Sequence, residues 1–212
     1  MKVYQVKIEI KDSEPLIWRR VLISASMSFQ GLHRVIQRVL DFKDQHLYMF
    51  HLPDHTLKVT TDPEALEVYQ EYLENKEQIE KTLGALNTPF AREQLEKLRT
   101  EVRRPSELAI APYVQVDGTF EYVYDFTDNW EIVVSVEGVL EDYALEYPLL
   151  LAGEEGAPVE NMGGFDHFKD FLAAYHNPEH PDHSQAKAWG DQVGFADYDG
   201  EAIQERLKAW RE

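Results

Sequence analysis

The chain has 212 residues, a length that suits one large domain or one domain with an insertion. Its residues are 43% hydrophobic and 12% aromatic, a composition that excludes a disordered polypeptide. It contains no cysteine, so disulfides, thiolate metal sites and a cysteine nucleophile are excluded. The formal net charge of −18 is concentrated in residues 105–168, which hold 14 acidic residues and no Lys or Arg. This segment would attract cations or a basic partner and repel phosphate, or it would only be a solvated face that favours solubility.

The N-terminal stretch MKVYQVKIEI alternates polar and apolar residues as a strand does, and it lacks the features of a signal peptide. No apolar run approaches the roughly 18 residues that a helix needs to cross a bilayer. We therefore expect a soluble, cytoplasmic protein that does not enter a membrane.

Alternation and helical spacing predict the first elements of the fold. Residues 4–10 and 16–23 are expected to form a β-hairpin, with the polar turn KDSEP between them. Ser28 is the expected N-cap of an amphipathic helix over residues 29–40, in which apolar side chains recur every three or four positions.

Two further strands are expected at residues 46–52 and 56–60, after which the chain changes character. Pro63 is suited to start one helix and Pro89 a second, because proline is tolerated at the first helical position. We interpret residues 61–104 as an αα-hairpin that is inserted into the main domain and packs on it.

The central acidic segment predicts a second β-hairpin. The stretches TFEYVYDF and WEIVVSVEGV alternate, and Thr127-Asp128-Asn129 between them is a typical turn. The aromatic side chains that are expected to share one face of its first strand are Phe120, Tyr122, Tyr124 and Phe126.

The C-terminal part is predicted to be mainly helical. A long loop at residues 141–164 leads to a helix that ends before Pro178, and two short helices follow near 182–189 and 200–211. The fold class expected for residues 1–212 is therefore a single α+β domain with a mainly antiparallel sheet, helices packed on it and the inserted αα-hairpin.

Five motifs occur in the order that is typical of a known family. The segment IWRRVLISASMSFQGLHRVIQRVLDFKDQHLYMF carries the first two, and YVYDFTDNWEI, YPLLLAGEEGAPVENMGG and NPEHPDH carry the others. Together they resemble the plasmid pRiA4b ORF-3-like family over about four-fifths of the chain, leaving out the inserted helices. The resemblance implies an α+β fold but no established activity, although some members are labelled resolvase-like passengers of insertion elements.

The chain departs from the family pattern at several positions. Tyr48 stands where the family often has a second histidine, Ile132 stands where a histidine often follows the hairpin tryptophan, and Gly156 and Met162 stand in a loop that is often flanked by cysteines. These positions are therefore apolar or weakly coordinating here, which speaks against a metal site built from them.

His180 and His183 form the first candidate site. A His-x-x-His spacing can direct both imidazoles toward one divalent metal ion, with Asp125, Asp128 or His46 as further ligands. The alternative, which we favour, is a capped linker whose histidines bond to nearby carbonyls or acids.

Asp125 and Asp128, close to Trp130, form the second candidate site. Two carboxylates at a hairpin turn can hold a divalent cation or divide the roles of acid and base. The structural alternative, which we favour, pairs Asp125 with Arg19 or Arg20 in a buried ion pair.

The third candidate lies on the first predicted helix, where His33 and Gln37 are four residues apart and share a face. His46 meets His33 if the following strand packs over this helix, whereas the alternative is a packed, hydrogen-bonded histidine. The pair Gly163-Gly164 before a helix could bind an anion through free amides, but the surrounding acids favour a tight turn.

Three functions compete on this sequence. The favoured hypothesis is a non-enzymatic binding or accessory module whose acidic face meets a basic protein partner. The alternative is a metal-dependent hydrolase-like enzyme that uses the His and Asp residues with a divalent metal. A DNA recombinase, as the resolvase-like label implies, is least favoured, because the net charge opposes direct nucleic-acid binding. The early arginines available to it are Arg19, Arg20, Arg34 and Arg38.

Overall fold

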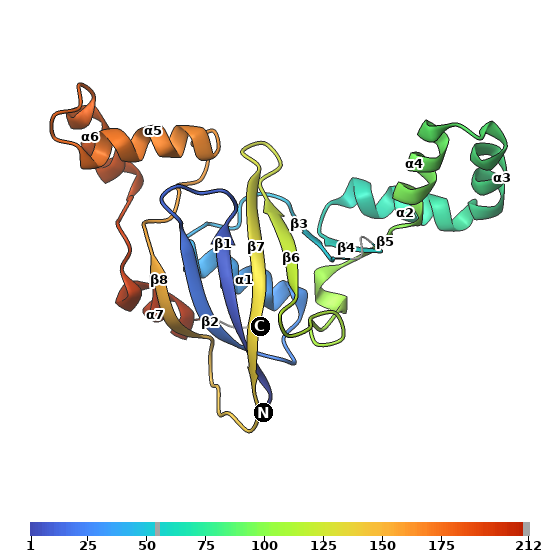
Figure 1. Cartoon of the computed structure of the whole chain (residues 1–212), viewed down its shortest axis with the longest axis horizontal. Coiled ribbons are helices and arrows are strands. Elements are labelled where there is room, and N and C mark those ends of the chain that lie inside the picture. The colour runs from blue at the N-terminus through green and yellow to red at the C-terminus, as the bar shows by residue number, and fades with distance from the viewer. Residues whose placement is uncertain (54–55, 210–212) are drawn as a thin grey trace.

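The fold is built on one eight-stranded sheet with the strand order β5-β4-β3-β6-β7-β1-β2-β8 (Figure 1). A computed structural model describes residues 1–53 and 56–209. The strands are β1 Val3–Ile10, β2 Trp18–Ser24, β3 Tyr48–His51, β4 Leu57–Thr60, β5 Glu101–Arg103, β6 Thr119–Tyr124, β7 Trp130–Leu140 and β8 Leu149–Glu154. Every neighbouring pair is antiparallel except β4 and β5, so the predicted α+β class with a mainly antiparallel sheet is confirmed.

The helices cover one face of this sheet and extend beyond two of its corners (Figure 1). They are α1 Phe29–Val39, α2 Pro63–Glu74, α3 Lys76–Leu86, α4 Pro89–Arg99, α5 Phe165–His176, α6 His183–Val193 and α7 Gly200–Lys208, with a 3₁₀ turn at Pro105–Glu107. In Figure 1, α2 to α4 form an arm on one side and α5 with α6 an arm on the other. No helix in the described part of the chain is long and apolar enough to cross a membrane.

The main core lies between the sheet and α1. Strand alternation directs Tyr4, Val6, Ile8 and Ile10 into it, as the sequence predicts, and each of them is buried. The expected N-cap of α1 is also confirmed, since Ser28 Oγ accepts a hydrogen bond from the Gly31 amide at 3.0 Å.

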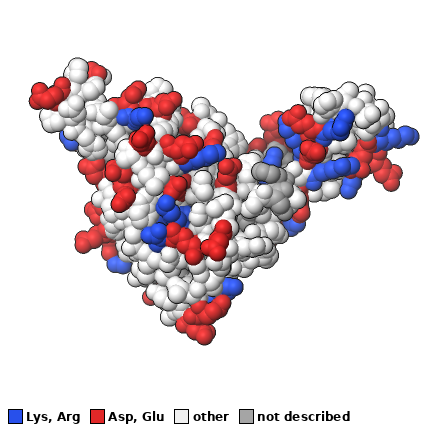
Figure 2. Space-filling view, in the orientation of Figure 1, with Lys and Arg blue, Asp and Glu red and all other residues white. Residues whose placement is uncertain are grey.

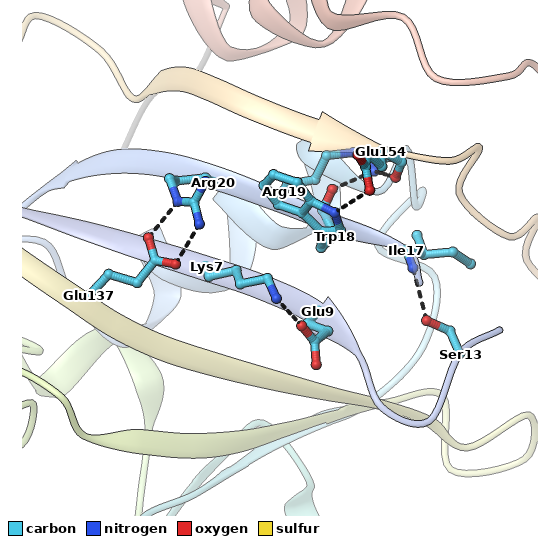
Figure 3. Close-up of polar contacts among 9 residues, drawn as sticks. All are labelled: Lys7, Glu9, Ser13, Ile17, Trp18, Arg19, Arg20, Glu137 and Glu154. Atoms are coloured by element: carbon cyan, nitrogen blue, oxygen red, sulfur yellow. Dashed lines mark hydrogen bonds and ion pairs between the residues drawn. The ribbon is translucent and has the colours of Figure 1, made fainter. Parts of the chain in front are cut away.

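The opposite face of the sheet carries charged side chains from both halves of the chain. Lys11 Nζ lies 3.1 Å from a Glu121 oxygen and 2.8 Å from a Glu131 oxygen, and Arg20 donates to both oxygens of Glu137. Figures 2 and 3 show this face, with basic and acidic groups side by side. The acids that the central segment contributes here are therefore partly neutralised by bases from the first 20 residues, which its sequence alone does not show.

The inserted segment contains three helices, not the two that we predict. The first helix ends at Asn75, whose side-chain amide donates to the Glu71 carbonyl at 3.0 Å and so competes with the helix backbone. After α4, the short strand β5 returns the chain to the sheet beside β4.

Three details of the predicted strands are corrected. The segment expected to be a loop at 141–164 contains β8, which pairs with β2 at the edge of the sheet. It was missed because its side chains do not alternate between buried and exposed. Phe126 does not share the face of Tyr124 but is 44% exposed, because Asp125 turns the chain with a φ of 55°. The strand expected from 46 begins only at Tyr48.

Candidate functional site

Parts of three of the motif segments meet at one place in the molecule, although they are far apart in the sequence. We call this place the motif junction and define it as residues 41–47, 124–130 and 157–164. Its three segments are the loop after α1, the turn of the β6–β7 hairpin and the loop between β8 and α5.

Tyr124 and Glu160 connect the three segments. Glu160 Oε1 accepts hydrogen bonds from the Tyr124 hydroxyl and, at 2.8 Å, from the Lys43 amide, while the Gln45 amide donates to the Tyr124 oxygen at 2.9 Å. Burial, aided by the Glu160 carboxylate, raises the pKa of Tyr124, so this phenol remains protonated and can donate. Neither residue is among the candidates from the sequence; the signals for them are the motif segments that contain them, YVYDFTDNWEI for Tyr124 and YPLLLAGEEGAPVENMGG for Glu160.

Asp128 holds the two glycines in place. Its Oδ2 accepts a hydrogen bond from the Gly163 amide at 3.1 Å. Gly164 has a φ of 85°, and a Cβ there would lie 2.8 Å from the Asp128 carbonyl oxygen. Only glycine therefore fits beside this hairpin, and the turn that we favour for Gly163-Gly164 is the one observed.

Asp125 is buried, but its partner is not an arginine. Its Oδ1 accepts from the amides of Thr127 at 3.0 Å and Asp128 at 3.4 Å, which stabilises the turn. Its Oδ2 lies 3.5 Å from His46 Nε2, an electrostatic contact without hydrogen-bond geometry. The predicted pairing of Asp125 with Arg19 or Arg20 is therefore wrong.

The two arginines point to opposite faces of the sheet, as alternation along β2 requires (Figure 3). Arg20 pairs with Glu137 on the charged face. Arg19 is buried and donates to four carbonyl oxygens, a role that only the tertiary structure reveals. Its acceptors are the carbonyls of Trp18, Val39, Glu154 and Glu155.

Burial lowers the pKa of Arg19 to about 10, because the charged guanidinium loses water. Because Arg19 and Arg20 lie on opposite faces of the sheet, these two arginines do not join one cluster of the kind that strand cleavage by a recombinase would need. This finding removes one support for that hypothesis.

His33 belongs to a buried hydrogen-bonded network next to the motif junction. Its Nδ1 lies 2.7 Å from the Tyr122 hydroxyl and its Nε2 lies 2.8 Å from Asp44 Oδ1, while Gln37 Nε2 donates to the Tyr122 oxygen at 3.1 Å. The imidazole also stacks on Tyr48, with ring centroids 3.6 Å apart. His33 and Gln37 thus share one partner, as their spacing suggests, whereas the expected contact between His33 and His46 is replaced by these neighbours.

The electrostatics of this network favour a neutral imidazole. Burial lowers the pKa of His33, although the Asp44 carboxylate opposes the shift. Nε2–H therefore donates to Asp44, and Nδ1 accepts from the Tyr122 hydroxyl, whose pKa burial raises well above its usual range. Tyr122 is completely buried and His33 is 2% exposed, so these two side chains stabilise the core, whereas Asp44 at the end of the network is exposed.

Two polar atoms at the junction have no hydrogen-bond partner among the described residues. They are Trp130 Nε1, in a side chain that is 1% exposed, and His46 Nε2. Trp130 packs instead against the ring of Phe42, with centroids 6.1 Å apart. Its role here is to fill the core beneath the hairpin.

His180 and His183 lie outside the junction, on the α5–α6 arm. His183 Nδ1 lies 2.9 Å from the Ala174 carbonyl oxygen, and His180 Nδ1 accepts from the Asp182 amide at 3.2 Å. Within residues 1–53 and 56–209, no three His, Cys, Asp or Glu side chains gather to hold a metal ion, so these histidines do not meet Asp125 and Asp128. The contact of His183 with a carbonyl is one that the linker interpretation expects, whereas Asp182, the N-cap of α6, makes no side-chain capping hydrogen bond.

A groove of about 840 Å³ runs along the α5–α6 arm. Aromatic and apolar side chains, with Phe171 and Trp189 among them, contribute to its lining together with Asp170, Asp182 and His180. None of the described residues that line it is Lys or Arg. We call it the α5–α6 groove; its residues are Asn161, Met162, His167, Asp170, Phe171, Ala173, Ala174, His180, Asp182, Gln185, Ala186 and Trp189.

The family model described as plasmid pRiA4b ORF-3-like protein matches residues 2–206. The chain belongs to this family. The matched range runs through the helical insertion, so the pRiA4b ORF-3-like similarity extends beyond the four-fifths that the motifs indicate.

One curated protein and one solved structure are similar to this pRiA4b ORF-3-like chain. The uncharacterised protein y4hQ of Sinorhizobium fredii (strain NBRC 101917 / NGR234) is 26% identical over 202 residues, covering 94% of this chain and 85% of its own. A crystal structure of MM3350, a protein of unknown function from Methanosarcina mazei Go1, superimposes with a TM-score of 0.67 at 24% identity and covers 94% of this chain and 96% of its own. The latter likeness concerns the fold alone.

Proposed function

We propose that the protein is a non-enzymatic binding module and that the α5–α6 groove holds a basic segment of a protein partner. The observation that carries this proposal is the composition of the groove, which combines carboxylates and aromatic rings with no Lys or Arg among its described lining residues. A carboxylate and an indole face are the two groups that bind a Lys or Arg side chain most effectively.

The groove is also suited to binding by its accessibility and its construction. Asp170 and Asp182 are exposed, and neither forms a close ion pair with a Lys or Arg in the described part of the chain. Beneath them, Phe171 packs edge-on against Trp189 at 4.9 Å and against Phe195 at 4.9 Å. The arm therefore has a packed aromatic core that keeps the groove in shape, and its carboxylates remain available to a partner.

The buried polar groups support a binding role over catalysis. The histidine with a shifted pKa is His33, and it is enclosed with Tyr122 in the core, where no substrate reaches it. At the junction, the carboxylates of Asp125, Asp128 and Glu160 contact backbone amides, the Tyr124 hydroxyl or His46.

The test uses the fluorescein-labelled peptide Ac-Arg-Leu-Arg-Lys-Leu-Arg-NH₂ and fluorescence anisotropy, with an acidic peptide of the same length as a control. We expect the basic peptide to bind and its affinity to fall as salt increases. The double variant Asp170→Asn with Asp182→Asn should weaken binding about tenfold. Asp191→Asn changes an exposed carboxylate of α6 that is outside the groove and should leave binding unchanged. Equal binding of the two peptides, or an unaffected double variant, would contradict the proposal.

A further inference from the structure

A second, smaller hollow lies on the other side of the loop at residues 157–161. It has a volume of about 330 Å³, and we call it the α7 cleft. The end of α1, the loop after it and the segment 193–206 form its other walls. A cleft of this volume is at the small end of the range that holds low-molecular-weight ligands.

Most charged groups in the α7 cleft are already paired. Asp41 lies 2.8 Å from Lys43 Nζ and 3.7 Å from Arg206 Nε, and Asp197 lies 2.8 Å from His176 Nε2. Asp199 caps α7 by accepting from two backbone amides. These groups therefore leave little charge for a ligand to neutralise.

Arg19 is a cation of the cleft without an anionic partner. Its guanidinium has five N–H bonds, and the four carbonyl contacts described above use four of them. No carboxylate in the described part of the chain is within ion-pair distance, and Tyr198 covers one side of the guanidinium, with its ring centroid 4.9 Å from Cζ. The fifth N–H, on Nη2, therefore has no hydrogen-bond partner in the described part of the chain, and Arg19 is one of the residues that line the cleft although it is only 1% exposed.

Glu160 is the opposite case, a carboxylate without a cation. It accepts from the Tyr124 hydroxyl and the Lys43 amide, but no Lys, Arg or His side chain among the residues described is within ion-pair distance. Its side chain is half-buried, so the charge is only partly screened by water.

Arg19 and Glu160 both line this cleft, and each is bonded to the same short stretch of chain. Arg19 donates to the Val39 carbonyl, and Glu160 accepts from the Lys43 amide. The rest of the cleft lining includes apolar side chains, among them Pro158, Val159 and Val193. A ligand with one negative charge, one positive charge and an apolar portion would therefore match the lining.

We propose that the α7 cleft binds a free α-amino acid with an apolar side chain. Its carboxylate accepts the unused N–H of Arg19, its ammonium group donates to Glu160, and its side chain contacts the apolar walls. Each end of the ligand then neutralises a charge that the protein leaves uncompensated. This site is separate from the α5–α6 groove, and neither proposal depends on the other.

The experiment measures binding of L-leucine to the full chain by isothermal titration calorimetry and by thermal shift. N-acetyl-L-leucine and L-leucine methyl ester are the matched ligands, because each lacks one of the two charges. We expect one L-leucine to bind per chain, and each blocked derivative to bind at least about tenfold more weakly. Sodium phosphate, an anion without an ammonium group, should bind no better than the blocked ligands.

The protein control uses two equivalent substitutions. Glu160→Gln keeps an oxygen for the Tyr124 hydroxyl and the Lys43 amide but removes the charge, and it should weaken L-leucine binding about tenfold. Glu146→Gln changes an exposed carboxylate outside the cleft and should leave binding unchanged. If Glu160→Gln fails to fold, the proposal is tested by comparing the binding of L-leucine and of its two blocked derivatives to the unaltered protein.

Three results would overturn the proposal. The first is the absence of a thermal shift with any free apolar amino acid at about 10 mM. The second is equally tight binding of N-acetyl-L-leucine or phosphate. The third is full affinity of a folded Glu160→Gln variant.

Discussion

Two regions of the molecule contain the same types of polar side chain but differ in what these side chains contact. The first is the motif junction together with the neighbouring His33 network, and the second is the α5–α6 groove. At the junction and in the network, His33, Asp125 and Asp128 bond to groups of the protein itself. In the groove, Asp170 and Asp182 are exposed to solvent. The histidine and aspartates of the first region therefore stabilise the fold, whereas the second region, which includes His180 and Asp182 of the NPEHPDH motif, has exposed carboxylates that a partner could bind.

The comparison also separates stability from function. Substitutions at the junction, in the His33 network and at Arg19 should lower the free energy of unfolding, because they disturb buried groups that bond to one another. Changes in the groove should alter binding with little effect on stability. The predictions below test this separation, beginning with the largest effect.

Arg19→Met should produce the largest loss of stability, about 3–5 kcal/mol, because methionine leaves four carbonyl oxygens without their donor. The matched variant Arg20→Met removes the more exposed pair with Glu137 and should cost no more than about 1 kcal/mol. Urea denaturation followed by circular dichroism measures both. Equal losses would show that the buried carbonyl contacts are unimportant.

His33→Gln should cost about 1–3 kcal/mol near neutral pH, since it disrupts the bonds to Tyr122 and Asp44. His167→Gln, in the exposed part of the groove, should change stability by less than about 0.5 kcal/mol. A similar loss for both variants would remove the distinction between the two regions.

The same residue predicts a pH dependence. The folded protein lowers the pKa of His33, so below the ordinary histidine value of about 6.5 the unfolded chain binds a proton that the folded protein does not. Stability should therefore decrease as the pH falls from about 6.5 to the lowered pKa of His33. Denaturation curves at a series of pH values should show this decrease in the unaltered protein and a smaller one in His33→Gln. Parallel curves would contradict the prediction.

Gly164→Ala should destabilise the junction by about 1–2 kcal/mol, because its φ of 85° disfavours a side chain and the new Cβ would contact the Asp128 carbonyl. Gly84→Ala is the control, since this glycine lies within α3 and nothing lies within 4 Å of an added Cβ. There alanine should stabilise the helix by up to about 1 kcal/mol. Thermal denaturation of the two variants should shift the midpoint in opposite directions.

Asp170→Asn with Asp182→Asn should have the smallest effect on folding, less than about 0.5 kcal/mol, because both side chains are exposed. Combined with the loss of peptide binding expected for this variant, an unchanged unfolding midpoint would show that the groove binds without supporting the fold. A large loss of stability would mean that the groove acids belong to the structural network.

The sequence by itself determined the class of the fold and most of its elements. Alternation in residues 4–10, the N-cap at Ser28 and the turn after Tyr124 depend on neighbours within a few positions, so each could be predicted locally. The five motifs likewise indicated the family that the chain belongs to.

Only the tertiary structure decided which polar residues meet. Arg19 was expected to pair with Asp125, but Arg19 bonds to carbonyls from β2, α1 and the end of β8, while Asp125 stabilises its own turn. Such partners depend on contacts between segments more than 100 residues apart, as for Arg19 and Glu154. Two elements also leave only weak patterns in the sequence. The end of α2 at Asn75 depends on a bond from its side chain to the Glu71 carbonyl. The strand β8 lies at the edge of the sheet and pairs with a neighbour on one side only.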